Sequence, residues 1–192
     1  MARYVIAALI PDPWATDIQK LRLEHDKWSR QWLRAHITIV PPFHARFMGD
    51  TLRNIEAAAL PINVTFQGWG SFPHEKSTTL WIETGAAGTA DIRQRLVGAV
   101  PELAQMLMDP QVDWTQSASH HVTIVNHIPN DALASIEPEI RKIDIEGTCT
   151  IPHLTVFRWD PRVGQWLRAR MADVPLVQLA ETKEVGSQPK SE

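Results

Sequence analysis

The chain has 192 residues, of which 44% are hydrophobic and 21% charged, the composition of a globular protein with enough residues to bury a real core. Its net charge of −3 argues against a long nucleic-acid duplex as the ligand, because binding to a phosphate backbone depends largely on Lys and Arg. A lone cysteine, Cys149, excludes an internal disulfide framework and a cysteine-based zinc site.

The first half of the chain begins with an apolar run, Arg3 to Ile10, that ends at Pro11. The run is too short for a membrane span and lacks a small-residue cleavage region, so it predicts the first strand of a cytoplasmic protein. Asp12-Pro13 supplies a capping acceptor and a proline, which predict a helix running to about Leu33. The other predicted elements of this half are a strand from Ala35 to Pro41-Pro42, a helix over Asp50–Leu60 and a strand over Ile62–Trp69.

The second half repeats this plan. Its predicted elements are a strand over Thr78–Thr84, a turn over Gly85–Gly88, a helix from Thr89 to about Met108 bent or split at Pro101, a strand around His121, a short helix capped by Asn130, and strands over Ile143–Thr150 and Ile151–Trp159. The order strand, helix, strand, helix, strand therefore occurs twice. We interpret this as an internal duplication, which commonly packs about a pseudo-twofold axis.

The middle strand of each half carries the same tetrad, His36-Ile37-Thr38-Ile39 and His121-Val122-Thr123-Ile124, with the histidines 121 − 36 = 85 residues apart. Residues i and i+2 of a strand point to the same face about 7 Å apart. Each histidine therefore shares a face with its threonine, while the aliphatic residues turn toward covering helices. An imidazole that transfers a proton near neutral pH, beside a hydroxyl that donates to oxygen, suits phosphate chemistry.

Two lobes related by a twofold axis would present one histidine to each side of a single phosphorus. Displacement at phosphorus is in line, so one neutral imidazole can take a proton from the incoming oxygen while the other, protonated, supplies one to the leaving oxygen. Such a reaction needs no metal. It predicts a bell-shaped dependence of the rate on pH, with neither role assigned to a particular histidine.

The paired tetrads resemble those of the 2H phosphoesterase superfamily, and within it the bacterial 2′-5′ RNA ligase and cyclic phosphodiesterase group. RYVIAALIP is similar to the opening strand of that group, HITIVPPF to its first motif, and Leu154–Leu176 to its closing hairpin, with Arg158 where the family often has an arginine. Asn126 stands where RNA cyclic phosphodiesterases commonly have an arginine, which removes one cation from the surroundings of the phosphate.

The resemblance implies an α+β, bilobal, duplicated fold in which two mainly antiparallel sheets face a central cleft, with helices on the outside. We expect one domain over residues 1–179, with lobes of about 1–75 and 76–179 that could exchange strands, and a disordered tail over 180–192. We also expect a monomer, with no cofactor and no metal. It would open 2′,3′-cyclic phosphates or 2′-linked oligonucleotides, with reverse ligation in some members, using His36 and His121 as catalysts and Thr38 and Thr123 to bind phosphate. Its partners would be nucleotides or short RNA, without long duplexes or membranes.

Four further residues are candidates for substrate binding. Phe43 and Trp159 could stack on a base at the rim of the site, or could simply pack, and Arg158 and Asn126 could contact the substrate. His153-Leu154-Thr155-Val156 fits the tetrad too, but no helix precedes it, so we interpret it as coincidence.

Two other kinds of site stay open. One is a metal site at His120, His121 and His127, which lacks nearby carboxylates or thiols. The other is a module that binds a nucleotide or short RNA without turnover.

Overall fold

The computed structural model describes residues 2–26, 33–45, 55, 61–100, 103, 120–142 and 145–175. Eight strands and three helices are defined within these ranges: β1 (Ala2–Leu9), α1 (Trp14–His25), β2 (His36–Ala45), β3 (Ile62–Pro73), β4 (Ser77–Ala87), α3 (Thr89–Ala99), β5 (His120–Pro129), α5 (Asn130–Ile140), β6 (Thr148–Ile151), β7 (His153–Asp160) and β8 (Gln165–Pro175). The α+β class predicted from the sequence is confirmed.

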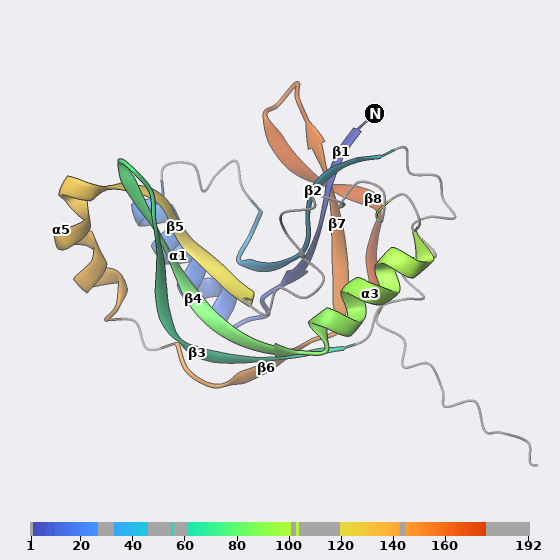
Figure 1. The fold of residues 1–192 in the computed structure, drawn as a ribbon, viewed down its shortest axis with the longest axis horizontal. Helices are drawn as coiled ribbons and strands as arrows, with labels where there is room; N and C mark the ends of the chain where they lie inside the picture. Colours follow the sequence, from blue (N-terminus) through green and yellow to red (C-terminus); the bar gives the residue numbers. More distant parts are fainter. Residues whose placement is uncertain are drawn as a thin grey trace, which may run out of the picture.

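The eight strands form one antiparallel sheet in the order β6-β3-β4-β5-β2-β1-β7-β8, which curves strongly across the molecule (Figure 1). The prediction of two separate sheets is therefore wrong in this detail. The physical reason is the join between β2 and β5, where a single register pair, Ile37 with Val122, connects two groups of four strands. Tertiary pairing of this kind leaves no mark in the local pattern of either strand.

Alternation along the central strands separates a core face from a more open face, as the sequence predicts. Ile37 and Ile39 on β2, and Val122 and Ile124 on β5, are at most 1% exposed and belong to the main hydrophobic core. The helices supply the other side of that core, through Ile18 and Leu21 of α1 and Ile92 and Leu96 of α3. Burial of these aliphatic side chains fixes which residues of β2 and β5 face away from the helices.

Helix α1 is shorter than predicted. It ends at His25, because Asp26 adopts extended dihedral angles (φ −106°, ψ 101°). Helix α3 begins at Thr89 as predicted and ends at Ala99, before Pro101, which lies outside the described residues. Of the helix predicted over Asp50–Leu60, the structure describes Ile55, which is helical and fully buried.

The remaining elements follow the predicted order with shifted ends. Strands β3 and β4 are longer than expected, so that β4 takes in residues predicted as a turn, and β6 is shorter. Helix α5 is present, but Asn130 is its first residue and not its cap, because Pro129 occupies the N-cap position. The closing hairpin, β7 with β8, is present, and the tail over 180–192 lies outside the described residues. Within the described ranges, no helix combines the length and apolar character needed to cross a bilayer.

Candidate active site

The two His-Thr pairs lie on the open face of the sheet. His36 and Thr38 on β2, and His121 and Thr123 on β5, are partly buried, whereas the aliphatic residues between them are fully buried on the opposite face. The alternation that the sequence predicts for both tetrads is thus present in the structure.

The Ile37–Val122 pair sets how the two tetrads meet. Because β2 and β5 are antiparallel, extending this register by one residue on each side places His36 across from Thr123, and His121 across from Thr38. The two histidines are then diagonal neighbours, a relation in which Cα atoms are about 7–8 Å apart. The arrangement is symmetric about the central pair, with each histidine flanked by a hydroxyl on its own strand and one on the neighbouring strand.

The ring of His36 is held in one tautomer. Its Nδ1 lies 2.6 Å from the carbonyl oxygen of Arg34, and a carbonyl only accepts, so Nδ1–H is the donor. In the neutral ring the lone pair is therefore on Nε2. Burial lowers the pKa of His36 to about 4 against the opposing effect of this hydrogen bond, and the charges of Arg22 and His121 lower it further. His36 is thus neutral at pH 7 and suited to accept a proton.

The ring of His121 is packed among aromatic residues. Its centroid lies 5.1 Å from that of Phe72, edge to face, and 5.5 Å from that of Trp81. Its Nδ1 is buried and has no hydrogen-bond partner within the described part of the chain. Burial, and secondarily the charge of Arg93, lower the pKa of His121 below its ordinary value.

Each histidine is influenced by a buried arginine from a helix. Arg93 on α3 donates from Nε to the carbonyl oxygen of Ile39 at 2.8 Å and from Nη2 to that of Thr38 at 3.1 Å. It thereby satisfies two backbone acceptors of β2 on one side of the Ile37–Val122 pair. Arg22 on α1 is 2% exposed, and its Nε and Nη1 have no hydrogen-bond partner in the described residues.

Asp26, the residue after α1, binds β5 at Asn126, four residues from the central pair. Its Oδ2 accepts from the backbone N–H of Asn126 at 3.2 Å and from Nδ2 of the same residue at 3.3 Å. Asp26 also partly offsets the effect of burial, which lowers the pKa of Arg22. The structure therefore places Asn126 next to the site, where its amide is bonded to a carboxylate from the end of α1.

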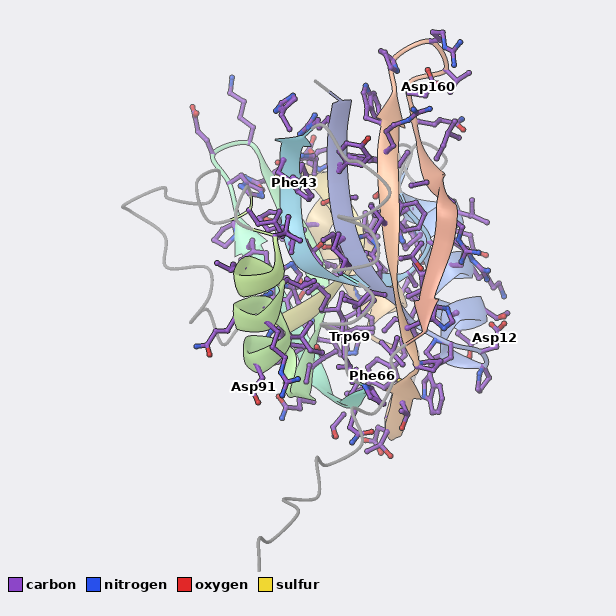
Figure 2. The ribbon with its side chains drawn as sticks, turned by 90° about the vertical axis from the view of Figure 1, so that its right-hand side faces the viewer. Asp12, Phe43, Phe66, Trp69, Asp91 and Asp160 are labelled. Carbon is purple, nitrogen blue, oxygen red and sulfur yellow. The ribbon has the colours of Figure 1, made fainter. Side chains whose placement is uncertain are left out.

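The other predicted substrate contacts are not gathered at the site. Phe43 lies on β2 (Figure 2). It is 4% exposed and packs on Tyr4 in the main core, with ring centroids 6.1 Å apart, so its ring is not available to a ligand. Arg158 is exposed but pairs with Tyr4 on the core face of β1. Trp159 packs edge to face on Trp166 of β8, at 5.5 Å, near the turn of the closing hairpin.

The other histidines of β5 have structural partners. His120 is 7% exposed, and its Nε2 lies 2.6 Å from Oγ1 of Thr89. His127 contacts Ser77, at 3.4 Å, and the ring of His74. In the apparent third tetrad, which begins at His153 on β7, Thr155 is fully buried. Among the described residues, no group of three or more His, Cys, Asp or Glu side chains is placed to hold a metal ion.

Four residues beside the histidines are absent from the sequence-based candidates: Arg22, Arg93, Phe72 and Trp81. A signal for Arg22 was available, since it continues the apolar stripe of α1 through Ala15 and Ile18 at a spacing of three and four residues. A charged residue in such a stripe is expected to have a specific role, because burying it is costly. Phe72 and Trp81 depend on strand pairing over long sequence distances, and Arg93 depends on the packing of α3 against β2.

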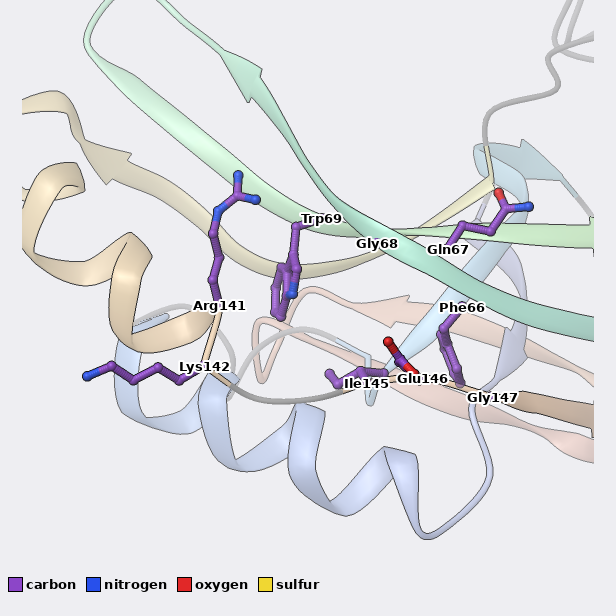
Figure 3. A pocket seen from close by; sticks show the side chains of 9 residues that line it. All are labelled: Phe66, Gln67, Gly68, Trp69, Arg141, Lys142, Ile145, Glu146 and Gly147. Carbon is purple, nitrogen blue, oxygen red and sulfur yellow. The ribbon is translucent and has the colours of Figure 1, made fainter.

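A cavity of about 480 Å³ lies elsewhere, between β3 and the segment from the end of α5 to β6 (Figure 3). Trp69 and Arg141 are among the residues that line it. Trp69 pairs with Ile82 on β4 and therefore lies on the same face of the sheet, and the side chain of Ile82 points into the core. The cavity is therefore on the other face of the sheet from His121. None of the four His and Thr residues lines it.

Comparisons with known proteins show the family and the fold of the chain. The family model of the 2′-5′ RNA ligase superfamily matches residues 10–162. LigT of E. coli, crystallised with 3′-AMP, superposes with a TM-score of 0.58 at 12% identity, covering 92% of this chain and 99% of that one. TT0787 of Thermus thermophilus gives 0.55 at 14% identity, covering 91% and 97%. No curated protein matches the chain by sequence.

Proposed function

Because the chain belongs to the 2′-5′ RNA ligase superfamily, we propose that it is a metal-independent phosphodiesterase acting on 2′,3′-cyclic phosphates or 2′-linked oligonucleotides. The observation that carries this proposal is the symmetric placement of His36, Thr38, His121 and Thr123 around the Ile37–Val122 pair. A phosphate over this pair would have one imidazole on each side, as in-line displacement requires.

In the proposed reaction His36 is the base. Its free Nε2 takes a proton from water as the water oxygen forms a bond to phosphorus. The bond between phosphorus and the leaving ribose oxygen breaks on the opposite side, and His121 gives that oxygen a proton. With a 5′-hydroxyl in place of water, the same steps would give ligation: His36 takes the proton of that hydroxyl as its oxygen bonds to the phosphorus of a 2′,3′-cyclic phosphate. The bond from phosphorus to the 3′-oxygen breaks, His121 gives that oxygen a proton, and a 2′-5′ linkage remains.

Electrostatics explain how His121, the proposed acid, would gain its proton. Burial and the nearby arginines lower the pKa of both imidazoles, which favours the neutral rings at pH 7. The negative charge of a bound phosphodiester counters that effect and raises the pKa of a nearby imidazole. Substrate would thus promote protonation of His121, while His36 keeps the tautomer set by Arg34. Thr38 and Thr123 would donate to the non-bridging oxygens, where charge accumulates.

Nucleotides are the substrate class that relatives support. The solved structures of E. coli LigT include complexes with ATP, 3′-AMP and NADP+. These ligands share a phosphate attached to a ribose and a base, and they are consistent with a site that binds one phosphate group between two strands.

Binding without turnover is the second candidate function. It is favoured by one observation, that the buried Nδ1 of His121 has no partner in the described residues to stabilise a protonated ring. If the bound phosphate did not supply that stabilisation, the site would hold a nucleotide without cleaving it.

The test is hydrolysis of a 2′,3′-cyclic nucleotide by the purified protein, before and after treatment with EDTA. We expect turnover that the chelator leaves unchanged, and a loss of roughly 10²- to 10⁴-fold in His36→Ala and in His121→Ala. His153→Ala, in the apparent third tetrad, is the matched control and should keep full activity. Binding without turnover would support the second function, and full activity in either site variant would reject the assignment.

A further inference from the structure

Three aromatic rings form a continuous surface on the site face of β3, β4 and β5. Phe72 and Trp81 stack with centroids 5.0 Å apart and planes inclined by 23°, and His121 lies 5.1 Å from the first and 5.5 Å from the second. The predicted catalytic imidazole is thus one member of a three-ring cluster, and the other two members have no part in the proton transfers described above.

Strand pairing explains why the rings meet. Trp81 pairs with Thr123 on one side and with Gly70 on the other, so its side chain lies on the same face as the threonine. A Cβ atom at Gly70 would overlap the Trp81 indole, which means that the ring lies directly over this glycine. Phe72, two residues further along β3, projects from the same face and covers the indole.

Phe72 is the member left open to solvent. It is 37% exposed, whereas Trp81 is only partly exposed and its Nε1 is buried. The other large apolar side chains found exposed in the described residues are Leu23, Val163 and Leu167, and none of these lies on β3, β4 or β5. An aromatic ring that is backed by a second ring, touches the imidazole and remains exposed is suited to stack on a flat ligand.

We propose that Phe72, supported by Trp81, is the stacking surface for the nucleobase of the substrate. This inference rests on the proposed function and adds to it a specific subsite. A phosphate held between the histidines brings the attached nucleoside within reach of the rings beside His121. Stacking on aromatic side chains is the usual way in which proteins hold unpaired bases, and it is tolerant of base identity because every base has a π face.

A stacking subsite predicts a particular substrate preference. In the described residues, the ring contacts of Phe72 are with Trp81 and His121, so the subsite itself should not read the hydrogen-bonding edge of the base. Purines, which offer the larger ring surface, should bind more tightly than pyrimidines, with a modest difference. A role limited to holding the His121 ring would predict no dependence on the base.

The experiment compares two cyclic phosphates that differ in the base. Adenosine 2′,3′-cyclic phosphate carries one, and glycerol 1,2-cyclic phosphate offers the same kind of five-membered ring without it. We expect Phe72→Ala to raise KM for the adenosine substrate by about tenfold, in line with the loss of one stacked base, and to leave kcat/KM for the glycerol substrate within about twofold. Phe72→Tyr should restore the adenosine KM, and Phe72→Leu should not.

Each outcome has one meaning. Leu167→Ala, which removes an exposed side chain on the closing hairpin, should leave KM and kcat unchanged for both substrates. An equal fall in kcat for both substrates in Phe72→Ala would overturn the subsite and assign the ring to positioning His121, with the proposed function intact. Failure of the unaltered protein to hydrolyse either substrate would instead reject the proposed function. In that case the Kd of adenosine 3′-monophosphate against that of inorganic phosphate still tests the stacking surface.

Discussion

The low pKa of His36 predicts a measurable effect on stability. A histidine in an unfolded chain has a pKa of about 6.5, whereas burial lowers that of His36 to about 4 in the folded protein. Below pH 6.5 the unfolded state therefore binds a proton at this position more readily than the folded state. The contribution of the neutral ring to stability is present above pH 6.5 and is lost as the pH falls toward 4.

The size of the effect follows from the two pKa values. The difference is about 2.5 pH units at about 1.36 kcal/mol per unit, and half protonation of the folded state at pH 4 leaves about 3 kcal/mol. The ring is partly exposed, so solvent screening makes this an upper value. His36→Gln removes the titrating group. Relative to the unaltered protein, the variant should gain at most about 3 kcal/mol between pH 7.5 and pH 4.

Urea unfolding followed by tryptophan fluorescence measures the effect on stability. The free energy of unfolding is measured for both proteins at pH 7.5 and at pH 4, and the difference of differences cancels the carboxylates that titrate in both. His44→Gln, at an exposed position of β2, controls for the loss of an imidazole as such. If His36→Gln loses as much stability on acidification as the unaltered protein does, the ring is not held neutral and its role as a base fails with it.

Three further predictions concern catalysis. Thr38→Val or Thr123→Val should cost on the order of 2 to 4 kcal/mol of transition-state stabilisation, read from kcat, if each hydroxyl donates to a developing oxyanion; unchanged kcat in both would contradict this. Because His36 must be neutral and His121 protonated, and the pKa of each is lowered, kcat/KM should rise with pH near 4 and reach its maximum below pH 6.5. A maximum at or above pH 7.5 would refute this. Arg22→Gln should raise the pKa of His36 and move the acid limb of that profile to higher pH, with Arg22→Lys closer to the unaltered protein, whereas an unmoved limb would exclude Arg22 as a cause.

The period of two in the tetrads was enough to predict which residues share the site face. Counting by two along β2 also places Phe43 with Ile37 and Ile39, and the structure buries it with them, although the pairing with β1 is irregular at two points between Thr38 and Phe43. The proposal that Phe43 stacks on a base came from its chemical type and not from its position in the alternation. Position was the more informative property.

Pairing between distant segments could not be predicted in the same way. The end of α1 depends on Asp26, whose carboxylate bonds Asn126, 100 residues away in sequence. The aromatic cluster depends on β3 pairing with β4 and β4 with β5, which brings Phe72 to His121. Neither contact is visible in a window of local sequence. For the same reason the sequence could not show that β2 and β5 meet in one pair.

The single register pair between β2 and β5, Ile37 with Val122, has a consequence for the size of the ligand that such a site accepts. A ladder of many hydrogen bonds between β2 and β5 would fix the spacing of the two imidazoles through the backbone. With one pair, that spacing depends also on the side chains that bind each strand, Arg93 on β2 and Asp26 on β5. Replacing Arg93 or Asp26 would change the distance between the two histidines while both strands keep their sequence. Substitutions in α3, or at the residue that follows α1, could therefore change the size of the molecule that is accepted while both tetrads stay the same.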